Sequence, residues 1–399
     1  MRVAIARSMP NFSMDVYADG LIAGLRAVRP NWDIVELAPR PVDRHSRSVQ
    51  MRAHKVYERF WNFPRQVQQQ AAIADIVHVI DHSEGHLVSW VKKTRTPVVV
   101  TCHDLINFFY RDNLQGSVQL PFVSSGLWLR SVKGMSQASH VVAVSSVTAH
   151  DTTQLLNIAP AQITVVPNAV EAIFQPTSLD QRAALRQQHG ATPETICLLN
   201  VGSNHPRKNL AVILQAVAIL KQQGLPVQLW KVSADFTDEQ KALIDQHSLA
   251  SHIRYLGNPT KATLVQIYSA ADILVAPSLH EGFGMTLLEA MACGTPVVTA
   301  NLSAMPEVAG DAGVLVDPHS SQAIADAITQ LHNDPNYYQT LVVKGLDRAK
   351  QFTWENTAAQ IAQLYEQLLG QTSDRALASP AFNSALNKDN NSPRVASSS

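Results

Sequence analysis

Two acidic residues frame a glycine turn in the segment HEGFGMTLLEAMACGTPVV, residues 280–298. Glu281 precedes the turn, and Glu289 lies within the short apolar helix that we expect to begin near Met285. Glycines let a ligand approach the backbone closely, and the free N–H groups at a helix N-terminus favour an anion such as phosphate. Because a carboxylate repels phosphate, we expect Glu281 to contact neutral sugar hydroxyls and Glu289 to accept hydrogen bonds from a ribose diol. An ordinary surface position is the alternative for Glu289.

Two basic residues follow another predicted strand, in the stretch SNHPRKN at 203–209. Arg207 and Lys208 open an amphipathic helix at its N-terminal end, where the helix dipole disfavours cations. A bound anion would offset this conflict, and a solvated pair of surface charges is the alternative. The stretch does not fit the phosphate-binding P-loop, because Arg207 stands where that loop needs glycine and Asn209 stands where it needs a hydroxyl.

Histidines follow two predicted strands of the first half of the chain. His103 comes directly after PVVVTC, so it faces a ligand at the strand end or serves as a structural histidine, with equal weight for both. His82 and His86 are four residues apart, but Gly85 would interrupt a helix there and no third ligand is spaced nearby. We therefore favour a loop that lines a cleft over a metal site. No G-x-G-x-x-G follows the first strand, which weakens a dehydrogenase interpretation.

The elements that must position these residues are short apolar strands that alternate with amphipathic helices. The runs are apolar throughout, as strands covered on both faces require. Those of the first half lie at 3–6, 33–37, 75–80, 97–104, 140–145 and 163–168. Those of the second half lie at 196–203, 227–233, 253–257, 272–278, 296–300 and 313–317. This alternation predicts an α/β fold with two Rossmann-like, doubly wound parallel sheets, and ligands sit outside the carboxyl ends of such strands.

A chain of 399 residues suits two domains. The regular pattern lapses after the strand that ends near 168, so we expect domains at 1–172 and 173–352. A last helix is expected at 353–370, with Thr353 as its N-cap. The stretch 371–399 is rich in Ser, Asn and Ala without periodicity, which predicts a disordered tail, with a docked extension as the alternative.

The composition excludes several classes of protein. With 32 basic and 32 acidic residues the formal net charge is zero, so nothing indicates a nucleic-acid partner. The three cysteines, Cys102, Cys197 and Cys293, are scattered and form no metal spacing, which favours a reducing cytoplasm. The first apolar run is too short for a signal peptide, and no stretch approaches the roughly eighteen apolar residues of a membrane span. We expect a cytoplasmic protein that is soluble or at most peripheral to the inner face of a membrane.

The segment 40–65 is basic and carries Tyr57, Phe60, Trp61 and Phe63. Such a stretch could make a peripheral contact with anionic lipid or with a lipid-linked acceptor. We favour the alternative, in which this is a charged outer helix whose aromatic side chains point into the domain.

Taken together, these stretches resemble the retaining nucleotide-sugar glycosyltransferases of family 4, which have the two-lobed GT-B fold. The segment 271–318 is similar to the E-x7-E signature of that family with its usual flanks, and VVPNAVEAIFQP and VGSNHPRKNL are similar to further family blocks. The resemblance runs from PVVVTCHDL to the FTWEN helix and is specific for family and fold, while it leaves the sugar open.

The resemblance implies a role for each matching residue. Glu281 would contact hydroxyls of the donor sugar, Lys208 would neutralise the diphosphate, and His103 would reach the transferred sugar; these three are the catalytic candidates. The nucleotide base would rest near 254–257. The donor-binding candidates are Ser203, Arg207, Lys208, Arg254, Gly282, Phe283, Gly284, Met285, Thr286 and Glu289. The acceptor-side candidates are Asn11, Asp15 and His82. No metal and no cofactor is expected.

The implied activity is transfer of a hexose from a nucleoside diphosphate sugar, of the GDP-mannose or UDP-glucose type, with retention and without a metal. The acceptor would be a glycan, a lipid-linked sugar or a small molecule. The domain 1–172, completed by the last helix, would face the acceptor, and 173–352 would bind the nucleotide sugar. Two features differ from the family. Ser203 replaces a frequent arginine, so Arg207 would take over part of its work, and the first loop reads NFSMDVY instead of carrying paired glycines. A sugar-nucleotide epimerase of the same fold and a non-catalytic nucleotide-sugar-binding protein are the alternatives.

Overall fold

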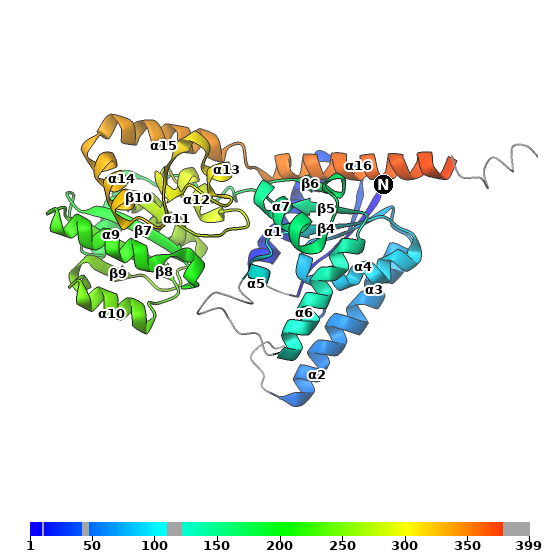
Figure 1. Ribbon diagram of the computed structural model, residues 1–399. Coiled ribbons are helices and arrows are strands. Elements are labelled where there is room, and N and C mark those ends of the chain that lie inside the picture. The colour runs from blue at the N-terminus through cyan, green and yellow to red at the C-terminus, as the bar shows by residue number, and fades with distance from the viewer. Residues whose placement is uncertain (10–11, 42–47, 110–121, 378–399) are drawn as a thin grey trace, which may run out of the picture.

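The computed structural model describes residues 1–9, 12–41, 48–109 and 122–377. Within these ranges the strands form two parallel sheets of six strands, one in each lobe (Figure 1). The first sheet contains β1 (Arg2–Ala6), β2 (Asp33–Leu37), β3 (Ile76–Val79), β4 (Val98–Cys102), β5 (His140–Ala143) and β6 (Ile163–Val165). The second contains β7 (Ile196–Gly202), β8 (Val227–Ser233), β9 (Ile253–Tyr255), β10 (Ile273–Ala276), β11 (Val297–Ala300) and β12 (Gly313–Val316). Each strand overlaps a predicted apolar run, which confirms the predicted fold class.

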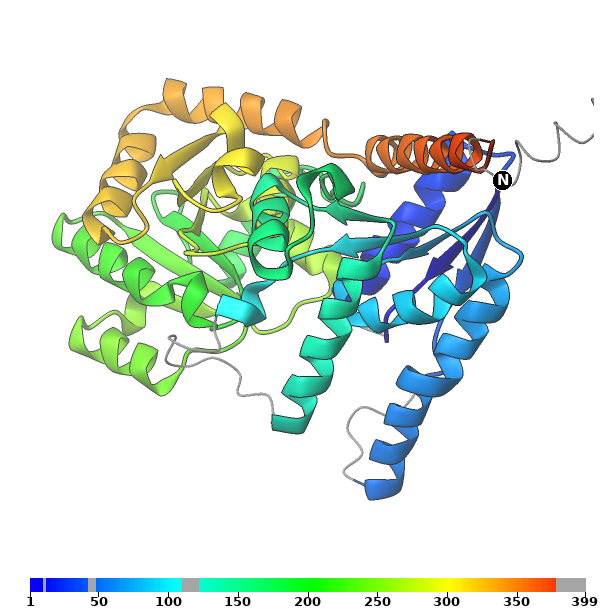
Figure 2. The same ribbon diagram turned by 45° about the vertical axis from the view of Figure 1, so that its right-hand side comes forward.

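Helices connect the strands in both lobes. Those of the first lobe are α1 (Phe12–Val28), α2 (Val49–Tyr57), α3 (Phe63–Ala71), α4 (Val88–Val91), α5 (Ile106–Phe109), α6 (Phe122–Gly134) and α7 (Ser146–Leu156). Those of the second are α8 (Leu179–Gln188), α9 (Leu210–Gln222), α10 (Asp238–Gln246), α11 (Lys261–Ala270), α12 (Met285–Ala292), α13 (Met305–Ala309), α14 (Ser321–Asn333) and α15 (Pro335–Ala349). A π-helix, η1 (Glu58–Asn62), joins α2 to α3, and short 3-10 helices include η2 (His82–Leu87) and η6 (Pro206–Lys208). The long segment α2–η1–α3 and α6 extend away from the first sheet in the same direction (Figure 2).

The strand order reverses once in each sheet. The orders are β2-β1-β3-β4-β5-β6 and β12-β11-β10-β7-β8-β9. The reversal therefore lies between β1 and β3 in the first sheet and between β7 and β10 in the second. In open α/β sheets, ligands bind at this switch point, outside the carboxyl ends of the strands. The loops that follow β7 and β10 are the positions where a ligand of the second lobe is expected.

Both faces of each sheet are covered, which explains the continuous apolar runs. In β7, Leu198 packs with Ile213 of α9 in one buried cluster, and Leu199 packs with Tyr268 of α11 in another. Adjacent residues of a strand point to opposite faces, so a strand that is buried on both faces needs apolar side chains at every position.

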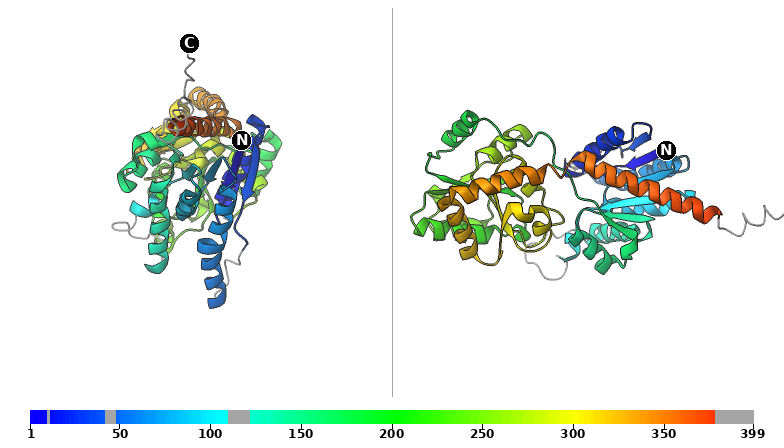
Figure 3. Two further views of the ribbon diagram at one scale, coloured as in Figure 1. Left: turned by 90° about the vertical axis from the view of Figure 1, so that its right-hand side faces the viewer. Right: turned by 90° about the horizontal axis from the view of Figure 1, so that it is seen from above.

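The last helix, α16 (Trp354–Leu377), returns from the second lobe and lies along the first (Figure 3). The Thr353 hydroxyl accepts a hydrogen bond from the Asn356 N–H at 3.2 Å, which confirms the predicted N-cap. A Cβ atom on Gly20 of α1 would overlap the Trp354 ring, so this glycine allows α16 to pack closely. The helix continues to Leu377, so the predicted tail is wrong for 371–377, while 378–399 lie outside the described residues.

Candidate functional site

Three charged side chains meet at the switch point of the second sheet. Arg207 and Lys208 follow β7, and Glu281 follows β10. The Glu281 carboxylate lies 2.6 Å from Arg207 Nη1 and 2.6 Å from Lys208 Nζ. Burial raises the pKa of the Glu281 carboxyl, but the charges of Lys208 and Arg207 outweigh it and hold the pKa below its usual value. Glu281 is therefore ionised, and the trio carries one positive charge in surplus.

The loops that carry these charges are fixed to each other by backbone groups. Arg207 and Lys208 lie in the 3-10 turn η6, directly before α9 rather than in its first turn. The Arg207 carbonyl accepts from the Leu279 N–H at 2.7 Å, and Arg207 Nη1 donates to the His280 carbonyl at 3.0 Å. The Asn209 amide donates to the Pro277 carbonyl at 3.1 Å. The trio is consequently pre-organised by the protein without any ligand.

The glycine turn leads into α12 as the sequence predicts. Gly284 has φ +117°, a conformation that favours glycine, and forms the N-cap of α12. Met285 and Thr286 then form the first turn, where amide groups have no partner within the helix. Phe283 is 5% exposed and packs on Phe352 with ring centroids 6.0 Å apart, so its side chain belongs to the core.

Residues of the first lobe form hydrogen bonds with the glycine turn that precedes α12. The Gly282 carbonyl accepts hydrogen bonds from Ser145 Oγ at 2.6 Å and Thr148 Oγ1 at 3.0 Å, and both donors come from the start of α7. A Cβ atom on Gly282 would overlap the carbonyl oxygen of His103. The two lobes are therefore in close backbone contact at the residue that follows Glu281, and only glycine fits there.

His103 is buried on the first-lobe side of the contact between Gly282 and the first lobe, which we call the junction. Its Nε2 lies 2.8 Å from the Ile80 carbonyl, so Nε2 carries a proton and donates it. Burial lowers the pKa of His103, which favours a neutral ring with a lone pair on Nδ1. The Tyr17 ring meets His103 edge-on, with centroids 4.7 Å apart. The imidazole is thus held in one orientation, and its Nδ1 can accept a hydrogen bond.

A cavity of about 170 Å³ lies between the lobes. Its walls include Tyr17 and His103 from the first lobe, Met285 and Glu289 from α12, and Trp354. The Glu289 carboxylate accepts from the Tyr268 hydroxyl at 2.6 Å, and burial raises the pKa of Glu289 to about 7. The alternative of an ordinary surface glutamate is therefore wrong, because this carboxyl is half-buried and faces the space between the lobes.

Two further predicted donor-binding residues are Ser203 and Arg254. Ser203 is exposed directly after β7. The Arg254 guanidinium donates to the carbonyls of His189, Ser251 and Ile253 at 2.8–3.2 Å. It thus turns toward the amino end of β9 and the end of α8, and the structure does not bring it to the trio.

The acceptor-side candidates are only partly described. Asn11 lies outside the described residues, and Asp15 on α1 pairs with Arg7 at 3.7 Å. His82 Nδ1 accepts a hydrogen bond from the His103 backbone N–H at 3.4 Å, so it helps to fix the backbone of His103. Both ring nitrogens of His86 are engaged, with Ser131 Oγ at 2.8 Å and the Arg59 carbonyl at 2.9 Å.

Sequence reasoning missed three polar residues near the trio. Lys231 of β8 is fully buried, and its Nζ lies 2.6 Å from the Gly202 carbonyl. The signal for it is a charge in the middle of the apolar run VQLWKVS, because lysine is almost never fully buried without a reason. Ser145 and Thr148 carry no such signal, since serine and threonine at the start of α7 also match an ordinary N-cap.

The aromatic segment of the first lobe is divided between core and surface. Phe63 is buried, but Tyr57 and Trp61 are 51% and 46% exposed, so the favoured inward orientation is wrong for these two. Trp61 meets Trp90 edge-on at 5.8 Å, and Arg65 lies 4.3 Å from the centre of the Trp61 ring. None of the helices in the described ranges has the length and apolar character that crossing a membrane would need.

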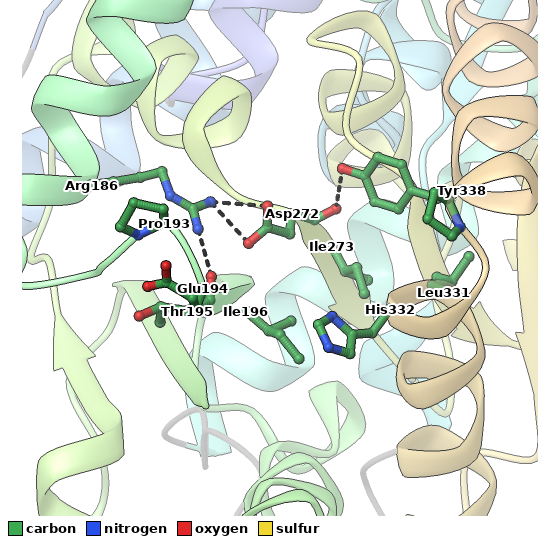
Figure 4. A pocket seen from close by; sticks show the side chains of 11 residues that line it. Arg186, Pro193, Glu194, Thr195, Ile196, Asp272, Ile273, Leu331, His332 and Tyr338 are labelled. Atoms are coloured by element: carbon green, nitrogen blue, oxygen red, sulfur yellow. Dashed lines mark hydrogen bonds and ion pairs between the residues drawn. The ribbon is translucent and has the colours of Figure 1, made fainter. Parts of the chain in front are cut away.

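A second cavity, of about 250 Å³, lies at the amino ends of β7 and β10 (Figure 4). There Arg186 Nη1 pairs with both Asp272 carboxylate oxygens at 2.9 Å, and Arg186 Nη2 donates to the Thr195 carbonyl at 2.5 Å. The Tyr338 hydroxyl donates to the Asp272 carbonyl at 3.0 Å. Here one positive charge meets one negative charge.

Comparison with known proteins agrees with this architecture. Residues 16–172 match the family model described as Glycosyltransferase Family 4, and 181–347 match Glycosyl transferases group 1. The chain is 32% identical over 239 residues to the O-antigen chain mannosyltransferase B of Escherichia coli, covering 59% of this chain and 62% of that protein. It is 26% identical over 348 residues to the serotype-specific mannosyltransferase WbdA of Escherichia coli, covering 84% of this chain and 41% of that protein. The chain thus spans less than two thirds of each of these relatives.

The fold has close counterparts among solved structures. Sucrose-phosphate synthase from Thermosynechococcus elongatus superposes with a TM-score of 0.72 at 22% identity, covering 93% of this chain and 100% of that one. This likeness identifies the two-lobed arrangement as the GT-B fold. The two family models fall one on each lobe, and the chain belongs to the group 1 glycosyltransferases.

Proposed function

We propose that this protein transfers a hexose from a nucleoside diphosphate sugar to a glycan, lipid-linked or small-molecule acceptor, with retention of anomeric configuration and without a metal. The observation that carries the proposal is the trio of Arg207, Lys208 and Glu281, which stands at the switch point beside the N-terminus of α12. Two cations with one surplus positive charge, next to free amide groups, suit a diphosphate.

The two cations would stabilise the leaving diphosphate. As the bond between sugar and phosphate breaks, negative charge grows on the diphosphate, and fixed cations stabilise it without reorganisation. Lys208 and Arg207 now pair with Glu281 at 2.6 Å. A bound diphosphate would draw both cations toward itself and leave the Glu281 carboxylate able to accept hydrogen bonds from the sugar. One set of charges would then serve both halves of the donor.

The hexose would be held by acceptors from both lobes. Glu281 offers an ionised carboxylate from the second lobe, and His103 offers the lone pair of Nδ1 from the first. Sugar hydroxyls donate to such groups, and the close approach at Gly282 keeps the two lobes in register. Glu289 would accept hydrogen bonds from the ribose hydroxyls, as its place in the interlobe cavity allows.

Mannose is the first candidate for the hexose, because the two relatives described above are named mannosyltransferases. GDP-mannose is accordingly the first donor to test, and UDP-glucose is the second.

We further propose that the exposed face of η1 and α4 touches an anionic membrane that presents a lipid-linked acceptor. Trp61 and Trp90 lie together there, and cations cover both rings, with Arg65 at 4.3 Å and Lys93 at 4.5 Å. Tryptophan and basic side chains favour the interface of anionic bilayers. Sedimentation with phosphatidylglycerol vesicles should weaken in Trp61→Ala but not in Tyr255→Ala, which removes a 43% exposed aromatic residue of the other lobe. Equal sedimentation of both variants would refute this contact.

A donor assay tests the proposed activity. The wild-type protein and Lys208→Ala are incubated with GDP-mannose or UDP-glucose and a panel of glycan and lipid-linked acceptors, with and without a chelator. We expect sugar transfer by the wild type only, unchanged by the chelator, and NMR of the product should show the anomeric configuration of the donor. Conversion of donor without any acceptor would indicate an epimerase instead. Binding of nucleotide sugar without turnover on the whole panel would indicate a non-catalytic protein.

A further inference from the structure

Lys231 is a fully buried cation in the centre of the second lobe. Its side chain belongs to β8, and its residue exposure is 0%. Nζ donates to the Gly202 carbonyl at 2.6 Å and to the Val232 carbonyl at 2.8 Å. In the part of the chain that the structure describes, its hydrogen-bond partners are thus two neutral oxygens and no carboxylate.

A lysine buried in this way is costly unless the charge is used. Removing an ammonium group from water carries a large penalty that two carbonyl oxygens offset only in part. An apolar residue at this position would match its neighbours in the run VQLWKVS. The charge at Lys231 therefore points to a role that an apolar side chain could not fill.

The position of Lys231 connects it to the trio. Gly202 ends β7 with φ +143°, and its carbonyl receives the Lys231 ammonium. On the other side of Gly202, Lys208 Nζ lies 3.7 Å from the point that a Cβ atom on Gly202 would occupy. Lys208 in turn contacts Glu281 at 2.6 Å. Two lysines thus bracket one glycine at the strand end where the diphosphate is expected.

We propose that Lys231 is a positioning residue of the donor site, which fixes the loop after β7 through the Gly202 carbonyl and adds a buried positive charge behind the diphosphate. This inference rests on the proposed function, because it names a further residue of the same site. The neutral hydrogen bonds hold the loop, and the charge acts on the anion through the protein interior, where electrostatic interactions are weakly screened.

The charge state of Lys231 supplies a signature. Burial and the charge of Lys208 lower the pKa of Lys231 to about 8, while Asp235 raises it. The other charged or titratable groups around the loop are Arg207, His205 and Glu281. A bound anion favours the charged lysine, so diphosphate affinity should be full at pH values below 8 and should fall as the pH rises through 8.

The test measures binding of GDP and UDP by titration calorimetry between pH 6.5 and 9, with the full-length protein and three variants. Lys231→Met keeps the volume but removes both charge and hydrogen bonds, and Lys231→Gln keeps a donor without the charge. Lys221→Met is the matched control, because Lys221 Nζ also donates to two carbonyls, those of His247 and Ser248 at 3.1 and 2.9 Å, at the end of α9. An apolar side chain at this position avoids the cost of burying a charge, so Lys231→Met should fold.

We expect Lys231→Met to weaken binding about 10–100-fold at pH 7, the range for losing hydrogen bonds to a charged group. It should also lose the decline in affinity around pH 8. Lys231→Gln should lose that decline as well but retain more of the affinity at pH 7, and Lys221→Met should behave as the wild type. Wild-type affinity with an unchanged pH profile in both Lys231 variants would overturn the inference, and a folding defect in one leaves the other to decide. If Lys208→Ala also binds as the wild type, the proposed function fails as well, so the two failures are distinguishable.

Discussion

The two ends of the second sheet each hold an arginine paired with a carboxylate, but their charges balance differently. At the amino ends of β7 and β10, Arg186 meets Asp272 one to one (Figure 4). At the carboxyl ends, one carboxylate, that of Glu281, pairs with two cations, Arg207 and Lys208, and buried Lys231 lies behind them. The distances between nitrogen and carboxylate oxygen are similar at the two ends, 2.9 Å for Arg186 and 2.6 Å for Arg207 and Lys208, so distance does not distinguish them. The unbalanced charge does, because it is unfavourable until an anion arrives.

The two ends of the second sheet thus serve different purposes, stability at the amino end and function at the carboxyl end. A balanced pair, such as Arg186 with Asp272, stabilises the fold without any need for a ligand. A surplus of cations at the switch point lowers the stability of the free protein, and binding of an anion restores that stability. Variants at the carboxyl end should therefore lose activity while they stay folded, and variants at the amino end should do the opposite.

Lys208→Ala should have the largest effect on activity. Loss of one group that stabilises developing charge typically lowers kcat about 10²–10³-fold. Steady-state kinetics with saturating donor measures this fall, and thermal unfolding should show a stable protein because Glu281 retains Arg207 as a partner. Lys350→Ala is the control, since Lys350 pairs with Asp347 on the surface. Turnover at the parental rate would contradict the assignment of the diphosphate site.

Gly282→Ala tests whether the carboxyl end depends on the first lobe. An added Cβ would overlap the His103 carbonyl, and we expect the lobes to move apart to relieve this overlap. Displacement of catalytic groups by about 1 Å can cost about 10²-fold in rate, and we expect a loss of this size in kcat/KM.

The matched control for Gly282→Ala is Gly126→Ala, because a Cβ on that glycine meets nothing within 4 Å. Small-angle scattering should show a larger radius of gyration for Gly282→Ala alone. An active Gly282→Ala with unchanged scattering would mean that the contact between Gly282 and the His103 carbonyl accommodates a Cβ without separating the lobes.

Arg186→Ala, at the amino end of the sheet, should lower stability while activity is retained. It leaves the Asp272 carboxylate without its partner in a place where burial raises the pKa of Asp272. Breaking a fully buried pair costs about 3–5 kcal/mol. Asp272 keeps 33% of its side-chain surface exposed, so we expect about 1–3 kcal/mol from urea unfolding. kcat at 25 °C should stay near the wild-type value, and a fall comparable to that of Lys208→Ala would refute the division between the two ends.

The sequence predicts the strands and all three residues of the trio for one physical reason. A parallel strand buried on both faces is apolar along its length, so its end is marked by the first polar residues, and those residues lie at the sheet edge. Arg207, Lys208 and Glu281 follow this rule. Arg254 breaks it, because it lies within β9 and its side chain turns back to the His189 carbonyl. The sequence shows where a strand runs but not to which end a long side chain extends.

Contacts between the lobes are harder to predict. Ser145 and Thr148 donate to the Gly282 carbonyl, 137 and 134 residues away along the chain. Nothing in the local pattern of either segment reveals the other. The same limit applies to α16, whose continuation to Leu377 was obscured by a composition typical of disorder.

Glu289→Gln is expected to have the smallest effect, and it concerns a carboxyl at the carboxyl end of the sheet whose hydrogen-bond partner is a neutral hydroxyl rather than a cation. Glu289 has a neutral partner, Tyr268, and burial raises its pKa from 4.5 to about 7. A carboxyl with a raised pKa contributes stability below about pH 4.5 and loses that contribution as the pH rises through 7. Glutamine never ionises, so the melting temperature of the variant should exceed that of the wild type by a few degrees at pH 8 and match it at pH 4.5. Glu355→Gln, an exposed position at the start of α16, is the control and should shift the melting temperature at neither pH. A difference for Glu289→Gln that is the same at both pH values would show that ionisation of Glu289 is not the cause.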